Sequence, residues 1–114
     1  MFKEVLQAKI HNATVTEADL KYIGSITIDE DLLDLIDLWP GQKVLVVSNT
    51  SGSRLETYVI KGQRGTGIIC MNGAAAHLIK KGEEIIVMGF AFSPAPIKAK
   101  GILVDGKNKF VKYL

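Results

Sequence analysis

The sequence predicts a mostly β fold, a small closed barrel carrying two short helices. Apolar runs of strand length recur along the 114 residues, and glycines and short polar clusters separate them at close intervals. Such spacing favours a closed barrel over an open sheet. A chain of this length, 47% hydrophobic, can bury one sizeable core but not two. We therefore expect a single domain over residues 1–114.

The first part of the chain is expected to be largely extended. Residues 4–11 and 14–17 have the composition of strands, and Ser25–Ile28 follows them after a polar loop. Acidic residues 29–31 then begin a short helix, because negative charge is favourable at the positive end of the helix dipole. Pro40-Gly41 ends that helix. Its apolar residues group on one side: Leu32, Leu33 and Ile36.

The middle of the chain predicts a hairpin. Residues 43–48 form a strand of the buried type, the polar turn 49–52 reverses the chain, and residues 54–61 pair back. Residues 62–67, a glycine-rich stretch containing Arg64, form a loop.

The last part alternates between strand and turn. A strand at 68–71 leads into Asn72–Ala76, where a second helix begins and runs to about Lys80 before Gly82 stops it. Residues 84–92 form another strand. Two final strands complete the pattern, and the breaks around them lie at Pro94, Pro96 and Asp105-Gly106.

Charge and composition indicate no particular macromolecular partner. The formal net charge of +2 is too small to indicate nucleic-acid binding by itself. Many lysines lie late in the chain, where a solvated rim is the expected arrangement and a phosphate-binding stripe the alternative. They are Lys80, Lys81, Lys98, Lys100, Lys107, Lys109 and Lys112.

We expect a cytoplasmic protein whose single thiol is buried and unreactive. Neither a signal peptide nor an apolar run long enough to cross a bilayer is visible in the sequence. Cys70 is the one cysteine, so it has no partner for an intramolecular disulfide, and its neighbours are apolar. No nearby sequence feature would lower its pKa.

Gly24-Ser25 is the most informative pair of residues. Gly24 has no side chain to shield its carbonyl and tolerates backbone angles that other residues avoid. The Ser25 hydroxyl lies one residue further on, within reach of that carbonyl in a tight turn. Attack by the serine would convert the amide into an ester, elimination would cut the chain, and hydrolysis would leave a ketone, the pyruvoyl group. Taken alone, such a pair is more often an ordinary turn that opens a strand.

Two further pairs of residues have chemical potential. Lys9 and His11 lie two apart on an extended segment, so both face one side. Arg54 and Tyr58 share a face of the hairpin, and Thr57 points the other way. An arginine can bond both oxygens of a carboxylate, and a tyrosine can donate a proton. Taken singly, each of these residues is more often an ordinary surface or partly buried side chain.

Asn72–Ala76 combines an amide side chain with backbone N–H groups at a helix start. Such donors suit an oxyanion or a carboxylate, and small side chains let a ligand approach the backbone. A tightly packed helix start explains the alanines equally well. No residues have metal-ligand spacing, because His11 and His77 stand apart and there is no second cysteine.

Together these motifs make the chain resemble the aspartate decarboxylase family, pyruvoyl enzymes that make β-alanine for pantothenate and coenzyme A. The resemblance runs from the start of the chain to about Phe92. Four motifs carry it in the family's order and spacing: Lys9–Thr16, Tyr22–Asp29, Arg54–Tyr58 and Asn72–Ala76.

The resemblance implies a barrel of double-psi type, assembled as a homotetramer with active sites between subunits. It implies self-cleavage between Gly24 and Ser25 into residues 1–24, the β chain, and 25–114, the α chain. The α chain would begin with a covalent pyruvoyl group and would need neither a metal nor pyridoxal phosphate. A helper protein for this maturation would be a further partner, whereas nucleic acid and membrane are not expected partners.

In that scheme Ser25 supplies the pyruvoyl group that forms a Schiff base with L-aspartate, and Tyr58 protonates the intermediate. Electrons released by loss of the α-carboxylate flow into the conjugated ketone system. The remaining implied roles are cleavage support by Thr57 and Asn72, carboxylate binding by Lys9 and Arg54, and pocket lining by His11, Tyr22, Thr57, Gly73, Ala74, Ala75 and Ala76.

Two alternatives remain open. The same chemistry would serve another acidic amino acid such as glutamate, and an unprocessed β-barrel would serve as a binding module. The joint presence of the motifs favours the decarboxylase, because a binding module has no need of that set. After Phe92 the chain lacks the acidic helical stretch that many family members carry, and it ends at Leu114, which leaves room for different packing between subunits.

Overall fold

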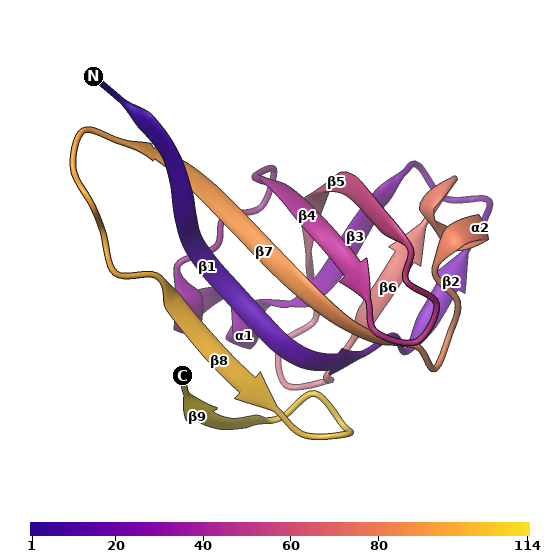
Figure 1. Cartoon of the computed structure of the whole chain (residues 1–114). Coiled ribbons are helices and arrows are strands. Elements are labelled where there is room, and N and C mark those ends of the chain that lie inside the picture. The colour runs from indigo at the N-terminus through magenta and orange to yellow at the C-terminus, as the bar shows by residue number, and fades with distance from the viewer.

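Nine strands form one continuous sheet, and two short helices lie at opposite ends of it (Figure 1). The computed structural model describes residues 1–114. In chain order the elements are β1 (Lys3–Thr14), β2 (Glu17–Asp19), β3 (Ser25–Asp29), α1 (Glu30–Ile36), β4 (Lys43–Ser48), β5 (Arg54–Gly62), β6 (Ile69–Asn72), α2 (Ala75–Leu78), β7 (Glu84–Ser93), β8 (Lys100–Val104) and β9 (Phe110–Tyr113). Neither helix has the length and apolar character needed to span a bilayer.

The sheet closes into a barrel because the continuous segment that contains β1 and β2 pairs with the two outer strands of the run β6-β3-β5-β4-β7. The strand order is β2-β6-β3-β5-β4-β7-β1-β8-β9. Val15 and Thr16 alone separate β1, which pairs with β7, from β2, which pairs with β6. Across this join the Thr16 N–H donates to the Ile69 carbonyl at 2.8 Å. The predicted small closed barrel is therefore confirmed, and β8 and β9 extend the sheet beyond it.

The barrel has an internal two-fold pattern of pairing. Its parallel pairs are β3 with β5 and β2 with β6, and the other pairs around the barrel are antiparallel. A half-turn that exchanges β3 with β6, β4 with β7, and β5 with β1–β2 carries this scheme onto itself. This two-fold pairing agrees with the double-psi type of barrel that the sequence resemblance implies.

The observed elements differ from the predicted ones mainly at their ends. The predicted segment 4–11 lies within β1, which a register shift between Ile10 and Ala13 bends rather than ends. Asn12 takes up that irregularity with a φ of 63°, a conformation that asparagine tolerates better than most residues. The predicted segment 14–17 spans the last residue of β1 and the first residue of β2. The second helix ends at Leu78 rather than near Lys80, and the short β2 was not predicted.

The core lies inside the barrel and under α1. Cys70 is 5% exposed, so the predicted burial of this thiol is confirmed. The helix α1 buries one side as predicted, through Leu32, Leu33 and Ile36. The inward residues of the strands are mostly β-branched, which suits a pleated, packed surface. Those with no exposed surface include Ile10, Ile26, Ile28, Ile69, Ile85 and Ile102.

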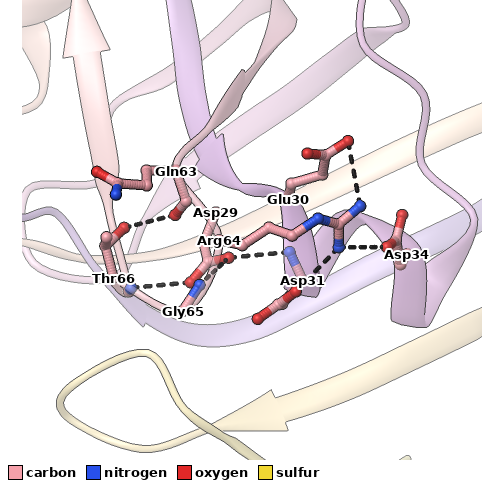
Figure 2. A network of polar contacts seen from close by, with 9 residues as sticks. Asp29, Glu30, Asp31, Asp34, Gln63, Arg64, Gly65 and Thr66 are labelled. Atoms are coloured by element: carbon pink, nitrogen blue, oxygen red, sulfur yellow. Dashed lines mark hydrogen bonds and ion pairs between the residues drawn. The ribbon is translucent and has the colours of Figure 1, made fainter.

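A polar network fixes α1 to the loop that follows β5 (Figure 2). The Asp29 carboxylate caps the helix by accepting from the Asp31 N–H at 2.9 Å. It also accepts from the N–H groups of Gly65 at 3.1 Å and Gly67 at 2.8 Å. The guanidinium of Arg64 pairs with three carboxylates of the helix, which raise its pKa further above the ordinary value. They are Glu30, Asp31 and Asp34.

Candidate active site

A cavity of about 400 Å³ lies beside Gly24, where β5, the end of β6 and α2 come together. It is open to solvent and lined by both polar and apolar side chains. The lining residues are Gly24, Leu55, Glu56, Thr57, Tyr58, Asn72, Ala74, Ala75 and Leu78.

The cavity exists because β5 is longer than its parallel partner. The pairing of β3 with β5 begins only at Val59, so residues 55–58 have β4 on one side and no strand on the other. The cavity runs along this free edge. Thr57 and Tyr58 therefore both line it, although successive strand residues point to opposite faces. The predicted opposite orientation of Thr57 and Tyr58 agrees with their burial, because Thr57 is half-buried and Tyr58 is exposed.

Ser25 is fully buried at the start of β3, directly opposite Asn72 on β6. The Nδ2 of Asn72 donates to the Ser25 Oγ at 2.9 Å. The Ser25 hydroxyl in turn donates to the carbonyl of Ile23 at 3.3 Å. These two bonds keep the hydroxyl folded back over the turn that contains Gly24.

The unusual backbone in this site belongs to Gly73, not to Gly24. Gly73 has a φ of +64°, and a Cβ there would lie 2.8 Å from both the N and the Cα of Gly24. Gly24 has no positive φ, and a Cβ on it would meet only the Asn72 carbonyl oxygen, at 3.9 Å. Gly24 therefore does not use the conformational freedom that glycine has. The close approach of the two segments places the requirement for glycine on Gly73.

The start of α2 faces the same cavity. Its N-cap residue is Ala74, and no side chain caps it. The first N–H groups of a helix have no partner within the helix. The small side chains of Ala74 and Ala75 leave those groups accessible from the cavity, an arrangement that suits a carboxylate or an oxyanion.

Seven residues predicted from the sequence do not line this cavity. Each of four is next to a lining residue in the chain, namely Ser25, Arg54, Gly73 and Ala76, and the other three are more distant in sequence. Lys9 and His11 lie on β1, whose neighbours are β7 and β8 rather than the strands around the cavity. The His11 Nδ1 is buried without a hydrogen-bond partner. Arg54 is exposed at the start of β5, and the Tyr22 side chain is half exposed in the loop before β3. One chain therefore holds only part of the predicted site.

Sequence reasoning missed two residues that contact the site. The Thr27 Oγ1 accepts from the Asn72 Nδ2 at 2.9 Å, and the Cys70 Sγ lies 3.2 Å from the Asn72 Oδ1. The alternation of strand side chains carried the signal, because it places residues 25 and 27 on one face of their strand and residues 70 and 72 on one face of theirs. The sequence did not reveal that β3 pairs with β6, which brings these two faces together.

The residues present suit a prosthetic group made from the chain itself. A buried serine hydroxyl, held by an amide N–H, follows an exposed glycine at the edge of a cavity. No group of three or more His, Cys, Asp or Glu side chains is placed to hold a metal ion.

The chain is similar to known proteins over almost its whole length. A family model described as "Aspartate decarboxylase" matches residues 1–111. A protein named "Aspartate 1-decarboxylase" from Neisseria meningitidis is 52% identical over 96% of this chain and 89% of that protein. A protein of the same name from Bacillus cereus is 56% identical over 100% of this chain and 93% of that protein. One from Pelotomaculum thermopropionicum is 50% identical over 98% of this chain and 88% of its own length. The computationally designed msDPBB_sym2 protein is partly similar in structure, with a TM-score of 0.47 and 20% identity over 76% of this chain and 99% of that chain.

Proposed function

The chain belongs to the aspartate decarboxylase family, and we propose that it converts L-aspartate to β-alanine and CO₂ with a pyruvoyl group formed from its own Ser25. The observation that carries this proposal is the Asn72–Ser25 contact at the edge of the cavity, where the hydroxyl follows Gly24. β-Alanine made in this way would serve the synthesis of pantothenate and coenzyme A.

The proposed cleavage needs only water as a co-reactant. The Ser25 Oγ attacks the Gly24 carbonyl carbon, the peptide C–N bond breaks, and the hydroxyl proton passes to the freed amine. Loss of the Ser25 Cα proton then expels the Gly24 carboxylate from Cβ and leaves a dehydroalanine end. Water replaces the nitrogen of that end, which departs as ammonia. Asn72 and Thr57, beside Gly24 in the cavity, are the residues proposed to hold the attacking group and the oxyanion.

The cavity residues suit the decarboxylation that follows. The ketone, once formed, supplies an electron sink for the electrons that the departing carboxylate leaves behind. Tyr58 lines the cavity and is 39% exposed, so its phenol can reach a small substrate and donate a proton. The N–H groups at the start of α2, where no side chain caps the helix, are proposed to donate to a substrate carboxylate.

We propose a homotetramer in which a second copy of the chain completes each cavity. A dicarboxylate substrate calls for cationic groups, and no lysine or arginine lines the cavity in one chain. Lys9 and Arg54 are the cations proposed to bind the carboxylates, and His11 and Tyr22 are proposed to complete the lining.

An intact mass spectrum of the denatured protein tests the proposal. We expect two fragments that meet between Gly24 and Ser25, the larger of them lighter by one ammonia than a chain beginning with serine. A single uncut chain that still decarboxylates aspartate would overturn the pyruvoyl assignment. The matched variant is Ser25→Ala, expected to be folded, uncut and inactive.

Substrate choice is tested in the same preparation. Aspartate and glutamate differ by one methylene, and turnover of both at equal rates would contradict specificity for aspartate. Salt-sensitive binding of RNA or DNA by an uncut, inactive chain would instead favour a binding module.

A further inference from the structure

Four side chains form a cross-strand square between β3 and β6. Ser25 lies opposite Asn72 and Thr27 opposite Cys70, so all four project from the same face of the paired strands. Asn72 lies at the centre of the resulting contacts. Its Nδ2 is 2.9 Å from both the Ser25 Oγ and the Thr27 Oγ1, and its Oδ1 is 3.2 Å from the Cys70 Sγ.

These contacts distinguish the two ends of the Asn72 amide. An amide has two N–H donors at one end and an acceptor at the other. The thiol of Cys70 can donate a hydrogen to Oδ1, while the hydroxyls of Ser25 and Thr27 accept one hydrogen each from Nδ2. Burial raises the pKa of Cys70, and the charges of Glu17 and Asp19 raise it further, so the thiol keeps the hydrogen that it donates.

We propose that Thr27 and Cys70 are positioning residues for self-cleavage, which act by fixing the Asn72 amide with its N–H group on the Ser25 Oγ. This inference rests on the function proposed above. Rotation of the amide by half a turn would place Oδ1 against the Ser25 Oγ. The serine hydrogen would then point at Oδ1, and the contact that holds the hydroxyl toward the Gly24–Ser25 turn would be lost.

The effect should be confined to maturation. The Ser25 hydroxyl is consumed when the chain is cut, so the Asn72 N–H no longer has that acceptor in the mature protein. Loss of the Thr27 hydroxyl should therefore slow cleavage and leave turnover per cut chain little changed. Substitution of a residue that only supports the fold would instead lower the thermal stability, the rate of self-cleavage and the turnover per cut chain together.

The test is the time course of cleavage in newly translated chain, followed by intact mass. Thr27→Val keeps the shape of the side chain and removes its hydroxyl, and we expect cleavage about fivefold to tenfold slower, the effect of one lost hydrogen bond. Thr27→Ser restores the hydroxyl and should cleave at close to the wild-type rate. Cys70→Ala should slow cleavage by a smaller factor, because a thiol is a weak donor, and Cys70→Ser should restore it.

The melting temperature and the turnover per ketone-bearing chain are measured beside each time course. Thr27→Val and Cys70→Ala chains that cleave at the wild-type rate would overturn the inference while leaving the proposed function standing. Equal slowing in Thr27→Val and Thr27→Ser would also overturn it, because packing rather than the hydroxyl would then be responsible. A wild-type chain that never cleaves would overturn the proposed function as well.

Discussion

Gly73 sets how closely the two segments of the candidate site approach each other. We expect Gly73→Ala to block or strongly slow cleavage and to destabilise the fold by about 1–2 kcal/mol, because the new methyl group would press on Gly24 in a left-handed backbone conformation. Intact mass and a thermal melt measure the two effects. Gly24→Ala is the matched control, since its methyl group has room, and it should still be cut. Uncut Gly24→Ala beside fully cut Gly73→Ala would contradict this assignment.

The residues of the site that sequence could predict are those that act near their neighbours in the chain. Gly24-Ser25 and Asn72 are local motifs, and the structure brings them together. Thr27 and Cys70 escaped notice because their role depends on which strands pair and in which register. Lys9 and Arg54 were predicted by resemblance, and neither of them lines the cavity in one chain.

At the scale of elements, Asp29 couples α1 to the loop after β5. Its two carboxylate oxygens accept three backbone N–H groups, and the residue is 2% exposed. Asp29→Asn replaces one oxygen by an amide nitrogen, which leaves a buried N–H without an acceptor. We expect a loss of about 1–3 kcal/mol in the free energy of unfolding, measured by urea denaturation. Asp34→Asn, on the exposed side of the same helix, should change it little; an equal loss would contradict the role of Asp29.

Glu83 joins the end of β4 to the turn before β7 and makes stability depend on pH. The Ser48 hydroxyl and the Lys80 N–H each donate to its carboxylate at 2.6 Å, and these bonds hold the pKa of Glu83 below its ordinary value of 4.5. The stabilisation is fully present above that value and is lost as pH falls through the lower folded pKa. Asp105, whose pKa the N–H groups of Lys109 and Lys107 lower, acts in the same direction.

We therefore expect the free energy of unfolding to fall between about pH 5 and about pH 2. The measurement is a series of urea titrations across that range. Glu83→Gln should be less stable at neutral pH and lose less stability on acidification. An unchanged slope in this variant would assign the pH dependence to other carboxylates.

The elements themselves were largely predictable, because each strand has its own turn signals and α1 its own cap. The exceptions have tertiary causes. β1 continues through the bend at Asn12 because β7 pairs with it on both sides of that bend. β2 is too short to have a sequence signal of its own and exists through its pairing with β6.

At the scale of the whole molecule, the separation of Lys9 from the Gly24 cavity predicts complementation between copies. Lys9→Ala and Tyr58→Phe chains should each be poorly active alone. Co-expressed in equal amounts, they should recover activity in about a quarter of the sites if each site takes the two residues from different copies. Each of the two copies has a chance of about one half of being the variant that keeps the residue it must supply. Turnover of the purified mixture measures this, and no recovery would mean that both residues serve a site from the same chain.

If the Gly24–Ser25 bond is cut as proposed, the pairing of β1 and β2 has a further consequence. Residues 1–24 contain both strands, so after the proposed cut this segment would stay in place through its pairing with β7, β8 and β6. Folding of the uncut chain is a unimolecular event, but a mature molecule that unfolds separates into two polypeptides that must find each other again. Its recovery from denaturant should therefore slow more steeply on dilution than that of uncut Ser25→Ala, for which only the assembly of copies depends on concentration. Such a protein would fold most readily before it is cut, and the presence of the cut would show that the chain had folded.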